Sequence, residues 1–326
     1  MHLYTPPKAA ENIPVIDLSP SFSGDLEDRR KVAWEIHKTA RDTGFFYVSG
    51  HGVDQALMDE HLEWAARFFD LPLEEKRALD SRNQDSTRGY EGMGAQTLDE
   101  GSPPDLKEGF MVSVEADENH RYTRLGVPGT GPNQWPDLPG FREHMESYNA
   151  RVIALGQHVA RLVALSLELP EDYFDETLKE PLFYSRLLKY PPHPKDAAPN
   201  QLGAGAHTDW GMLTFLLQDD IGGLEVQNRA GEWVAAPPIK GTYVVNFGAM
   251  IPVLTNGYYN ANMHRVLNNS SSEVRYSAPV FVDPDYDYYV ECVPTLKPEN
   301  GKLDYQPMTA GEHMRSMFEK TFGKAA

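Results

Sequence analysis

The second half of the sequence consists of short apolar runs separated by turn-forming residues. From about residue 183 onward, runs rich in β-branched, aromatic and aliphatic residues alternate with Gly, Asn, Asp and Pro. The segment Asn228-Arg-Ala-Gly231, which lies between two runs, is typical of a β-hairpin turn. Many short strands in regular succession predict a β-sandwich or jelly roll. The runs cover residues 212–218, 223–227, 233–236, 242–247, 264–267 and 275–282.

The first half of the sequence has mainly helical periodicity. Two short runs in it, 13–17 and 44–49, are instead rich in the residues that strands prefer. Residues 80–136 are rich in Gly, Pro, Asp and Asn and keep no period, which predicts irregular structure or a functional loop region. Apolar residues at helical spacing predict helices over residues 25–43, after a capping Asp54, over 141–167 and over 309–322.

The fold class that this order of elements predicts is mainly β with supporting helices. The sequence has no obvious interdomain linker or internal repeat, so we expect a single domain over residues 1–326. Within it, residues 1–180 form a mostly helical N-terminal support region and residues 181–290 form the jelly-roll core. Residues 291–326 complete the domain as a C-terminal helix and tail.

Composition excludes several classes of partner. The chain carries 30 Lys and Arg against 48 Asp and Glu, a formal net charge of −18, which argues against nucleic acid and against anionic membrane surfaces. Cys292 is the only cysteine, so no intrachain disulfide forms. The sequence has no signal-peptide pattern and no apolar stretch long enough to span a membrane. We therefore expect a cytoplasmic protein, and its oligomeric state stays open.

The tripeptide His207-Thr-Asp209 at the start of a predicted strand carries the clearest chemical signal. Side chains at i and i+2 of a strand point to the same face, so the imidazole and the carboxylate converge. His264 begins a later strand run and supplies a third ligand of the right type. Two His and one carboxylate form the facial site of non-haem Fe(II) oxygenases. The alternative is a chance tripeptide beside an unrelated histidine.

Arg275 and Ser277 form a second pair at i and i+2, on the run that follows His264. A guanidinium beside a hydroxyl is a receptor for a carboxylate, because arginine offers two parallel donors and serine offers another. A buried arginine needs an anionic partner. The alternative is a solvated arginine on an edge strand, which the spacing alone favours.

These motifs occur together with many others in the order of one family. The sequence resembles the isopenicillin N synthase-like branch of the Fe(II)/2-oxoglutarate-dependent oxygenases, and the resemblance covers nearly the whole chain. In the second half it rests on His207-Thr-Asp209, Gly222-Gly-Leu-Glu-Val226, Val244-Val-Asn-Phe-Gly248, His264-Arg-Val266 and Arg275-Tyr-Ser277. In the N-terminal and middle parts of the chain it rests on Ile13-Pro-Val-Ile-Asp17, Gly50-His-Gly52, Arg88-Gly-Tyr90, Lys107-Glu108 and Tyr190-Pro-Pro192.

The resemblance implies a double-stranded β-helix, a distorted jelly roll, and assigns roles to residues. His207, Asp209 and His264 match the iron ligands, while Arg275 and Ser277 match the pair that binds the distal carboxylate of 2-oxoglutarate. Tyr190 matches a tyrosine that often assists there, and its alternative role is packing. The implied cofactor is Fe(II), with 2-oxoglutarate as cosubstrate, O2 as oxidant and ascorbate as a supporting reductant.

The reaction that the resemblance implies is oxidative decarboxylation of 2-oxoglutarate coupled to oxidation, by default hydroxylation, of a small organic substrate. Arg88 is a candidate partner for a substrate carboxylate, and a solvated loop arginine is its alternative. Three other functions stay open at this point. They are an isopenicillin N synthase-type oxidase that does not use 2-oxoglutarate, an ethylene-forming oxygenase, and a binding module without turnover.

Overall fold

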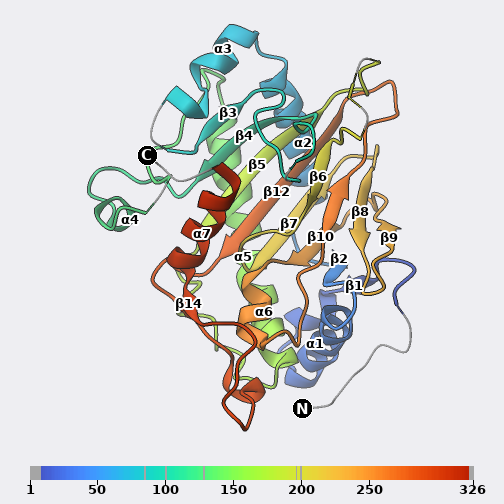
Figure 1. The fold of residues 1–326 in the computed structure, drawn as a ribbon, viewed down its shortest axis with the longest axis vertical. Helices are drawn as coiled ribbons and strands as arrows, with labels where there is room; N and C mark the ends of the chain where they lie inside the picture. Colours follow the sequence, from blue (N-terminus) through green and yellow to red (C-terminus); the bar gives the residue numbers. More distant parts are fainter. Residues whose placement is uncertain are drawn as a thin grey trace.

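The centre of the molecule is a pair of facing β-sheets, and helices cover the outer face of the larger sheet (Figure 1). The computed structural model describes residues 9–83, 86–99, 101–127, 129–195, 197–198 and 200–322. Residues 1–8 and the predicted tail after residue 322 lie outside the described residues. Within those ranges, no helix is both long and apolar enough to cross a membrane.

The larger sheet has eight strands in the order β1-β2-β10-β7-β12-β5-β4-β3. Strands β1 and β2 pair in parallel, and the other neighbours pair antiparallel. In sheet order the strands are β1 (Val15–Asp17), β2 (Phe45–Ser49), β10 (Tyr243–Phe247), β7 (Leu213–Gln218), β12 (Arg275–Asp283), β5 (Leu182–Tyr190), β4 (Glu108–Ser113) and β3 (Gly89–Glu91).

The smaller sheet has four strands and faces the larger one. Its order is β6 (Ala204–His207), β11 (His264–Val266), β8 (Leu224–Gln227) and β9 (Trp233–Ala235). Gln227 pairs with Trp233 across the predicted hairpin turn, so that prediction is confirmed. A separate two-stranded sheet joins β13 (Tyr289–Val290) to β14 (Met308–Thr309). The two main sheets form the predicted double-stranded β-helix.

Central strands of the larger sheet are buried on both faces. In β2, Phe46 and Val48 belong to the core that lies under the helices, whereas Phe45 and Tyr47 belong to the core between the two sheets. All four side chains are buried. A strand covered on both faces is apolar at every position, which explains why this run shows no alternation of polar and apolar residues.

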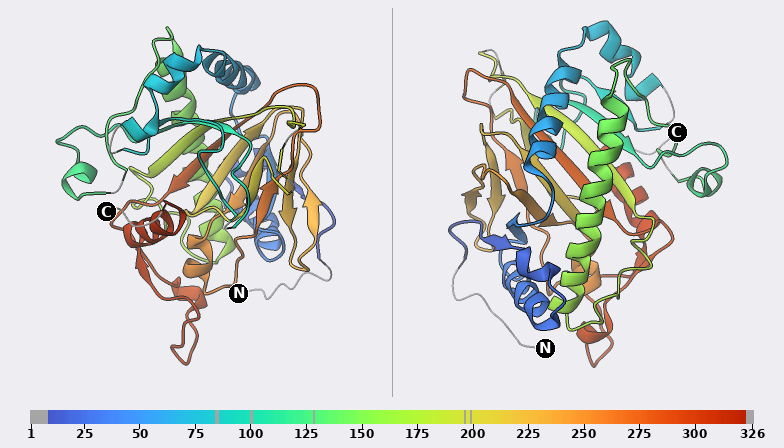
Figure 2. Two further views of the ribbon diagram at one scale, coloured as in Figure 1. Left: turned by 45° about the horizontal axis from the view of Figure 1, so that its top comes forward. Right: turned by 180° about the vertical axis from the view of Figure 1, so that it is seen from behind.

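The helices α1 (Leu26–Ala40), α2 (Gln55–Phe69) and α5 (Phe141–Ser166) pack on the face of the larger sheet that points away from the smaller sheet. The long helix α5 runs across the back of this sheet (Figure 2). A Cβ atom at Gly156 of α5 would lie 3.0 Å from Val282 of β12, so glycine permits this close approach. The helices are α1 (Leu26–Ala40), α2 (Gln55–Phe69), α3 (Leu73–Ala78), α4 (Arg121–Arg124), α5 (Phe141–Ser166), α6 (Met250–Thr255) and α7 (Ala310–Phe322). Short 3-10 turns are η1 (Ser19–Phe22), η2 (Ser81–Asn83) and η3 (Pro294–Leu296).

The predicted helix starts follow from side-chain caps. The carboxylate of Asp54 accepts a hydrogen bond from the Ala56 backbone at 2.9 Å and caps α2, as the sequence predicted. Asp25 caps α1 in the same way through Glu27. After α1 the chain turns at Gly44, whose φ of +63° and close approach to the Asn260 carbonyl favour glycine.

The prediction of irregular structure over residues 80–136 was wrong in part. This stretch contains β3 and β4, which extend the larger sheet beyond β5. Consequently the N-terminal half, predicted to be mostly helical, supplies four strands of that sheet. The partner of β4 is β5, which lies about seventy residues further along the chain. Local periodicity carries little information about a strand whose pairing depends on so distant a segment.

Candidate active site

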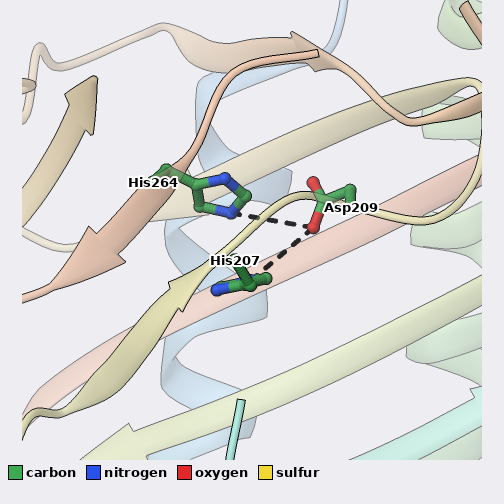
Figure 3. A group of neighbouring side chains, drawn as sticks. All are labelled: His207, Asp209 and His264. Atoms are coloured by element: carbon green, nitrogen blue, oxygen red, sulfur yellow. Dashed lines mark ion pairs between the residues drawn. The ribbon is translucent and has the colours of Figure 1, made fainter. Parts of the chain in front are cut away.

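His207, Asp209 and His264 converge at one end of the smaller sheet. His207 is the last residue of β6 and His264 is the first residue of β11, and the two stand directly opposite each other in the register. Their Nε2 atoms lie 3.8 and 3.6 Å from Oδ1 of Asp209 (Figure 3). One ligand atom from each residue lies within 4.8 Å of the others. Two imidazoles and a carboxylate can hold a divalent metal and leave part of its coordination sphere open.

The convergence was predicted from strand spacing, but the strand ends earlier than expected. Strand β6 stops at His207, and Asp209 lies in the segment that leads to β7. The pairing of β6 with β11 and the path of the chain after His207 bring the three side chains together. The spacing of two residues therefore predicted that these side chains converge, but for a reason that is only partly correct.

Hydrogen bonds orient the Asp209 carboxylate toward the histidines. Its Oδ2 accepts hydrogen bonds from Thr214 Oγ1 at 2.6 Å and from Asn246 Nδ2 at 2.8 Å, so Oδ1 is the oxygen that faces both imidazoles. Burial raises the pKa of Asp209, but the two histidines and these two donors lower it more, and the net shift is downward. The group is therefore an ionised carboxylate, the form that binds metal.

His207 is held in the tautomer that a metal ligand requires. Its Nδ1 lies 2.8 Å from the Gly205 carbonyl oxygen, and because a carbonyl only accepts, Nδ1 carries the proton. Nε2 therefore carries the free lone pair, and this atom lies on the side of the ring that faces Asp209. Burial, followed by the neighbouring His264, lowers the pKa of His207 well below its usual value, which keeps the imidazole neutral.

Replacing Asn246 with alanine tests the orientation of Asp209. We expect metal affinity to fall by about 10- to 100-fold, which is the usual cost of losing a hydrogen bond to a metal ligand. Isothermal titration with Mn(II) measures the change. Asn228→Ala is the matched control, because Asn228 is equally buried but holds the β8–β9 hairpin. Equal Mn(II) affinity of the two variants would contradict the role of Asn246.

Arg275 and Ser277 lie on the same face of β12 and are both 1% exposed. Strand β12 is paired on both sides, with β7 and β5, so the alternative of an edge strand is wrong. Arg275 Nη2 donates to Gln218 at 3.1 Å, whereas Nε and Nη1 are buried without a hydrogen-bond partner among the described residues. The Arg275 guanidinium carbon lies 4.7 Å from the centre of the Tyr190 ring. Buried guanidinium donors without partners fit an anion such as a carboxylate.

One cavity between the sheets contains both groups. The three metal-binding candidates line it together with Arg275, Ser277 and Tyr190. Beyond the metal cluster its wall is mainly apolar, with Met314 and Phe318 of α7 contributing to it. The other large side chains of this apolar wall are Leu98, Met111, Val127, Tyr184, Trp210, Phe281 and Tyr286. The cavity thus combines the metal-binding cluster and the buried Arg275 with a wall that is mainly apolar.

Arg88 lies apart from these residues. It is 2% exposed, and its Nη1 donates to the Gly129 carbonyl at 2.7 Å. Its neighbour Thr87 lines the cavity, but Arg88 is not among the residues that line it. The solvated-loop alternative is wrong for this buried side chain, and its role toward a substrate stays a prediction.

Sequence reasoning missed several charged residues of the cavity wall. Arg186 alternates with Leu188 and Tyr190 on the inner face of β5 and forms an ion pair with Glu91. Counting back in steps of two from Tyr190 would have found it. Asp283 accepts a hydrogen bond from the Met212 backbone at 2.7 Å, and burial raises the pKa of Asp283 to about 7. Lys107, known from the sequence only as part of a motif, also lines the cavity.

Comparisons with known proteins point to one family. The family described as "non-haem dioxygenase in morphine synthesis N-terminal" matches residues 13–138, and the 2OG-Fe(II) oxygenase superfamily matches residues 182–284. A 2-oxoglutarate-Fe(II) type oxidoreductase of Emericella nidulans is 36% identical over 318 residues, covering 96% of this chain and 91% of the relative. Homoarginine-6-hydroxylase of Glycine max is 34% identical and covers 93% of this chain and 95% of its own length.

A solved structure extends the agreement to the fold. A full-length Neurospora crassa protein, crystallised with alpha-KG (2-oxoglutarate) and 5-formyluracil, superimposes with a TM-score of 0.82 at 29% identity and covers 95% of this chain and 96% of its own. Three findings support the same family assignment. Relatives above 30% identity match the chain over nearly its whole length, family models match both halves, and the fold is shared. The chain belongs to the Fe(II)/2-oxoglutarate-dependent oxygenases, in the isopenicillin N synthase-like branch, and is an oxidoreductase that uses Fe(II), 2-oxoglutarate and O2 to oxidise a small organic substrate.

Proposed function

We propose that the protein hydroxylates a small, largely apolar substrate in the cavity between the two sheets. His207, Asp209 and His264 hold Fe(II), and Arg275 with Ser277 holds the distal carboxylate of 2-oxoglutarate beside the Tyr190 ring. The observation that carries the proposal is the state of Arg275. Two of its guanidinium nitrogens are buried without a partner among the described residues, in the same cavity as the metal-binding cluster.

The chemistry of the loaded site is oxidative decarboxylation: 2-oxoglutarate, O2 and a substrate C–H bond are converted to succinate, CO2 and a C–OH group. The protein's own residues prepare this reaction. Thr214 and Asn246 fix the carboxylate of Asp209, and the Gly205 carbonyl fixes the His207 ring. The apolar wall excludes water, so the electrostatic interactions inside the cavity are strong and side reactions with solvent are suppressed.

The wall beyond the cluster indicates the kind of substrate. Its apolar side chains suit an aliphatic or aromatic body, which would gain about 25 cal/mol for each Å² of apolar surface buried. The Glu91–Arg186 pair offers one polar point of attachment, since Nε of Arg186 is buried with no hydrogen-bond partner among the described residues. A small molecule with an apolar body and one polar edge therefore fits best. Hydroxylation is also the reaction in the name of the Glycine max relative.

Succinate release across a small-molecule library tests the proposal. The purified protein is incubated with Fe(II), ascorbate, 2-oxoglutarate and 18O2, and each compound is added singly. We expect a subset of compounds to raise succinate formation, with one labelled oxygen atom entering the succinate and the other entering the product. Protein stripped of metal by a chelator is the control.

The same assay separates the competing functions. Succinate that appears with no labelled product would mean that substrate oxidation is not coupled to decarboxylation. Ethylene in the headspace without added substrate would indicate fragmentation of 2-oxoglutarate itself. Failure of every compound to raise succinate, in protein that binds Fe(II) and 2-oxoglutarate, would refute hydroxylation of this substrate class.

A further inference from the structure

Asp105 and Lys107 form a buried ion pair at the wall of the cavity. Lys107 Nζ lies 2.5 Å from Asp105 Oδ2, and Lys107 and Asp105 are 5% and 2% exposed. Removing two charges from water is costly, and the cost is offset only when the pairing and further hydrogen bonds satisfy both groups. The proposed function uses neither Asp105 nor Lys107 to hold the metal or 2-oxoglutarate. The burial of this pair at the cavity wall therefore needs a separate explanation.

The second oxygen of Asp105 connects the pair to an iron-ligand candidate. Asp105 Oδ1 accepts a hydrogen bond from the Gly205 backbone N–H at 2.9 Å. The carbonyl oxygen of the same Gly205 accepts the Nδ1–H of His207 at 2.8 Å. A continuous chain of hydrogen bonds thus runs from Lys107 through Asp105 and Gly205 to His207, and it ends on the ring nitrogen that sets the direction of Nε2.

The contact at Gly205 is tight as well as polar. A Cβ atom at this position would lie 2.8 Å from both Cβ and the backbone nitrogen of Asp99, so only glycine allows the segment around Asp99 to rest on β6. The same segment contributes Gln96 and Leu98 to the cavity wall. One stretch of chain therefore contacts the substrate space and, through Asp105, holds the backbone that orients His207.

We infer that Asp105, neutralised by Lys107, is a positioning residue for His207, and that it couples metal affinity to the docking of this segment on β6. The carboxylate fixes the Gly205 backbone, and the lysine supplies the charge that lets the carboxylate stay buried. The inference rests on the proposed function, since it takes His207 to be a metal ligand. It adds that a residue from the N-terminal half of the chain, Asp105, supports the orientation of a metal ligand from the C-terminal half.

Two double variants of equal charge isolate the contact. The double variant Asp105→Asn with Lys107→Met keeps a side-chain oxygen that accepts the Gly205 N–H. The double variant Asp105→Ala with Lys107→Met has no such oxygen. Neither double variant leaves an unpaired buried charge. We expect the asparagine variant to bind Mn(II) nearly as tightly as the unaltered protein. We expect the alanine variant to bind it about 10- to 100-fold more weakly, the usual cost of losing support behind a metal ligand. Titration of the full chain with Mn(II) alone gives both constants.

A spectroscopic measurement reports on His207 itself. The 15N shifts of the imidazole in metal-free protein distinguish the two neutral tautomers. We expect protonation at Nδ1 to dominate in the unaltered protein and in the asparagine variant, and to be partly lost in the alanine variant. If the alanine variant is too unstable for this measurement, Gly205→Ala displaces the Asp99 segment instead and is expected to weaken Mn(II) binding in the same direction.

Lys76→Met is the matched control for general destabilisation. Lys76 Nζ lies 3.0 Å from Glu108 Oε2, Lys76 is as buried as Lys107, and the pair lies outside the cavity wall. We expect this variant to lose thermal stability and keep its Mn(II) affinity. Equal Mn(II) affinity of the alanine and asparagine double variants would overturn the inference. Absence of Mn(II) binding by unaltered protein, or its persistence in His207→Ala, would instead refute the metal site.

Discussion

Replacing His207 or Asp209 with alanine is expected to reduce iron-dependent succinate formation to the level of metal-free protein. Each change removes one of three converging ligands, and the remaining two lack the geometry that holds the metal with an open face. Asp209→Ala also removes the negative charge that offsets the metal, and it leaves the donors Thr214 and Asn246 buried without their acceptor. Succinate assays and metal analysis of the purified variants measure both losses.

A histidine outside the cavity controls for this change. His158 is partly buried, like His207, and its ring stacks on Phe22 and contacts Ser21. His158→Ala should lower stability and leave iron binding and the rate of turnover intact. Iron-dependent succinate formation by His207→Ala at the rate of the unaltered protein would remove His207 from the metal site.

Replacing Arg275 with methionine is expected to cause the second large effect, a rise in the KM for 2-oxoglutarate. Truncating one partner of a buried, hydrogen-bonded charge pair costs about 2–5 kcal/mol, which corresponds to roughly 30-fold to several thousand-fold in affinity. The KM for 2-oxoglutarate, measured with saturating substrate, reports the change. Mn(II) affinity should stay constant, because none of the described contacts of Arg275 is with His207, Asp209 or His264.

Arg275→Lys separates charge from geometry. Lysine keeps the positive charge but lacks the planar pair of donors, so we expect an intermediate KM. Ser277→Ala removes one hydroxyl and should raise the KM less, by about 1 kcal/mol or fivefold. An unchanged KM for 2-oxoglutarate in Arg275→Met, with weaker binding of the substrate instead, would mean that Arg275 holds a substrate carboxylate.

The net charge of −18 did not predict the ligand of this site. It argued against extended polyanions, whereas the cosubstrate is a small dianion. Charges exposed on the surface are screened by salt over about 8–10 Å. A guanidinium buried in a cavity acts at close range and in a lower dielectric, so Arg275 outweighs many distant carboxylates.

Short-range spacing predicted the residues whose partners are near in sequence. The sequence predicted three such features: the helix cap at Asp54, the hairpin after Gln227, and the pair Arg275 and Ser277 at a spacing of two. Each of them depends on a few adjacent residues. No such pattern predicted the strand β4 or the ion pair of Arg186 with Glu91. Each needs segments about seventy or more residues apart to meet, and no local pattern specifies which segments will do so.

By itself the sequence determined the types of candidate ligand and their order along the chain: a His-x-Asp pair, a later His, and an Arg-x-Ser pair within a series of short strands. Only the tertiary structure decided how these groups face one another. Pairing of β6 with β11 places His207 opposite His264, and the two-sided pairing of β12 buries Arg275 with donors that have no partner among the described residues. The physical reason is that ligand chemistry belongs to single side chains, whereas direction and burial arise from contacts between distant segments.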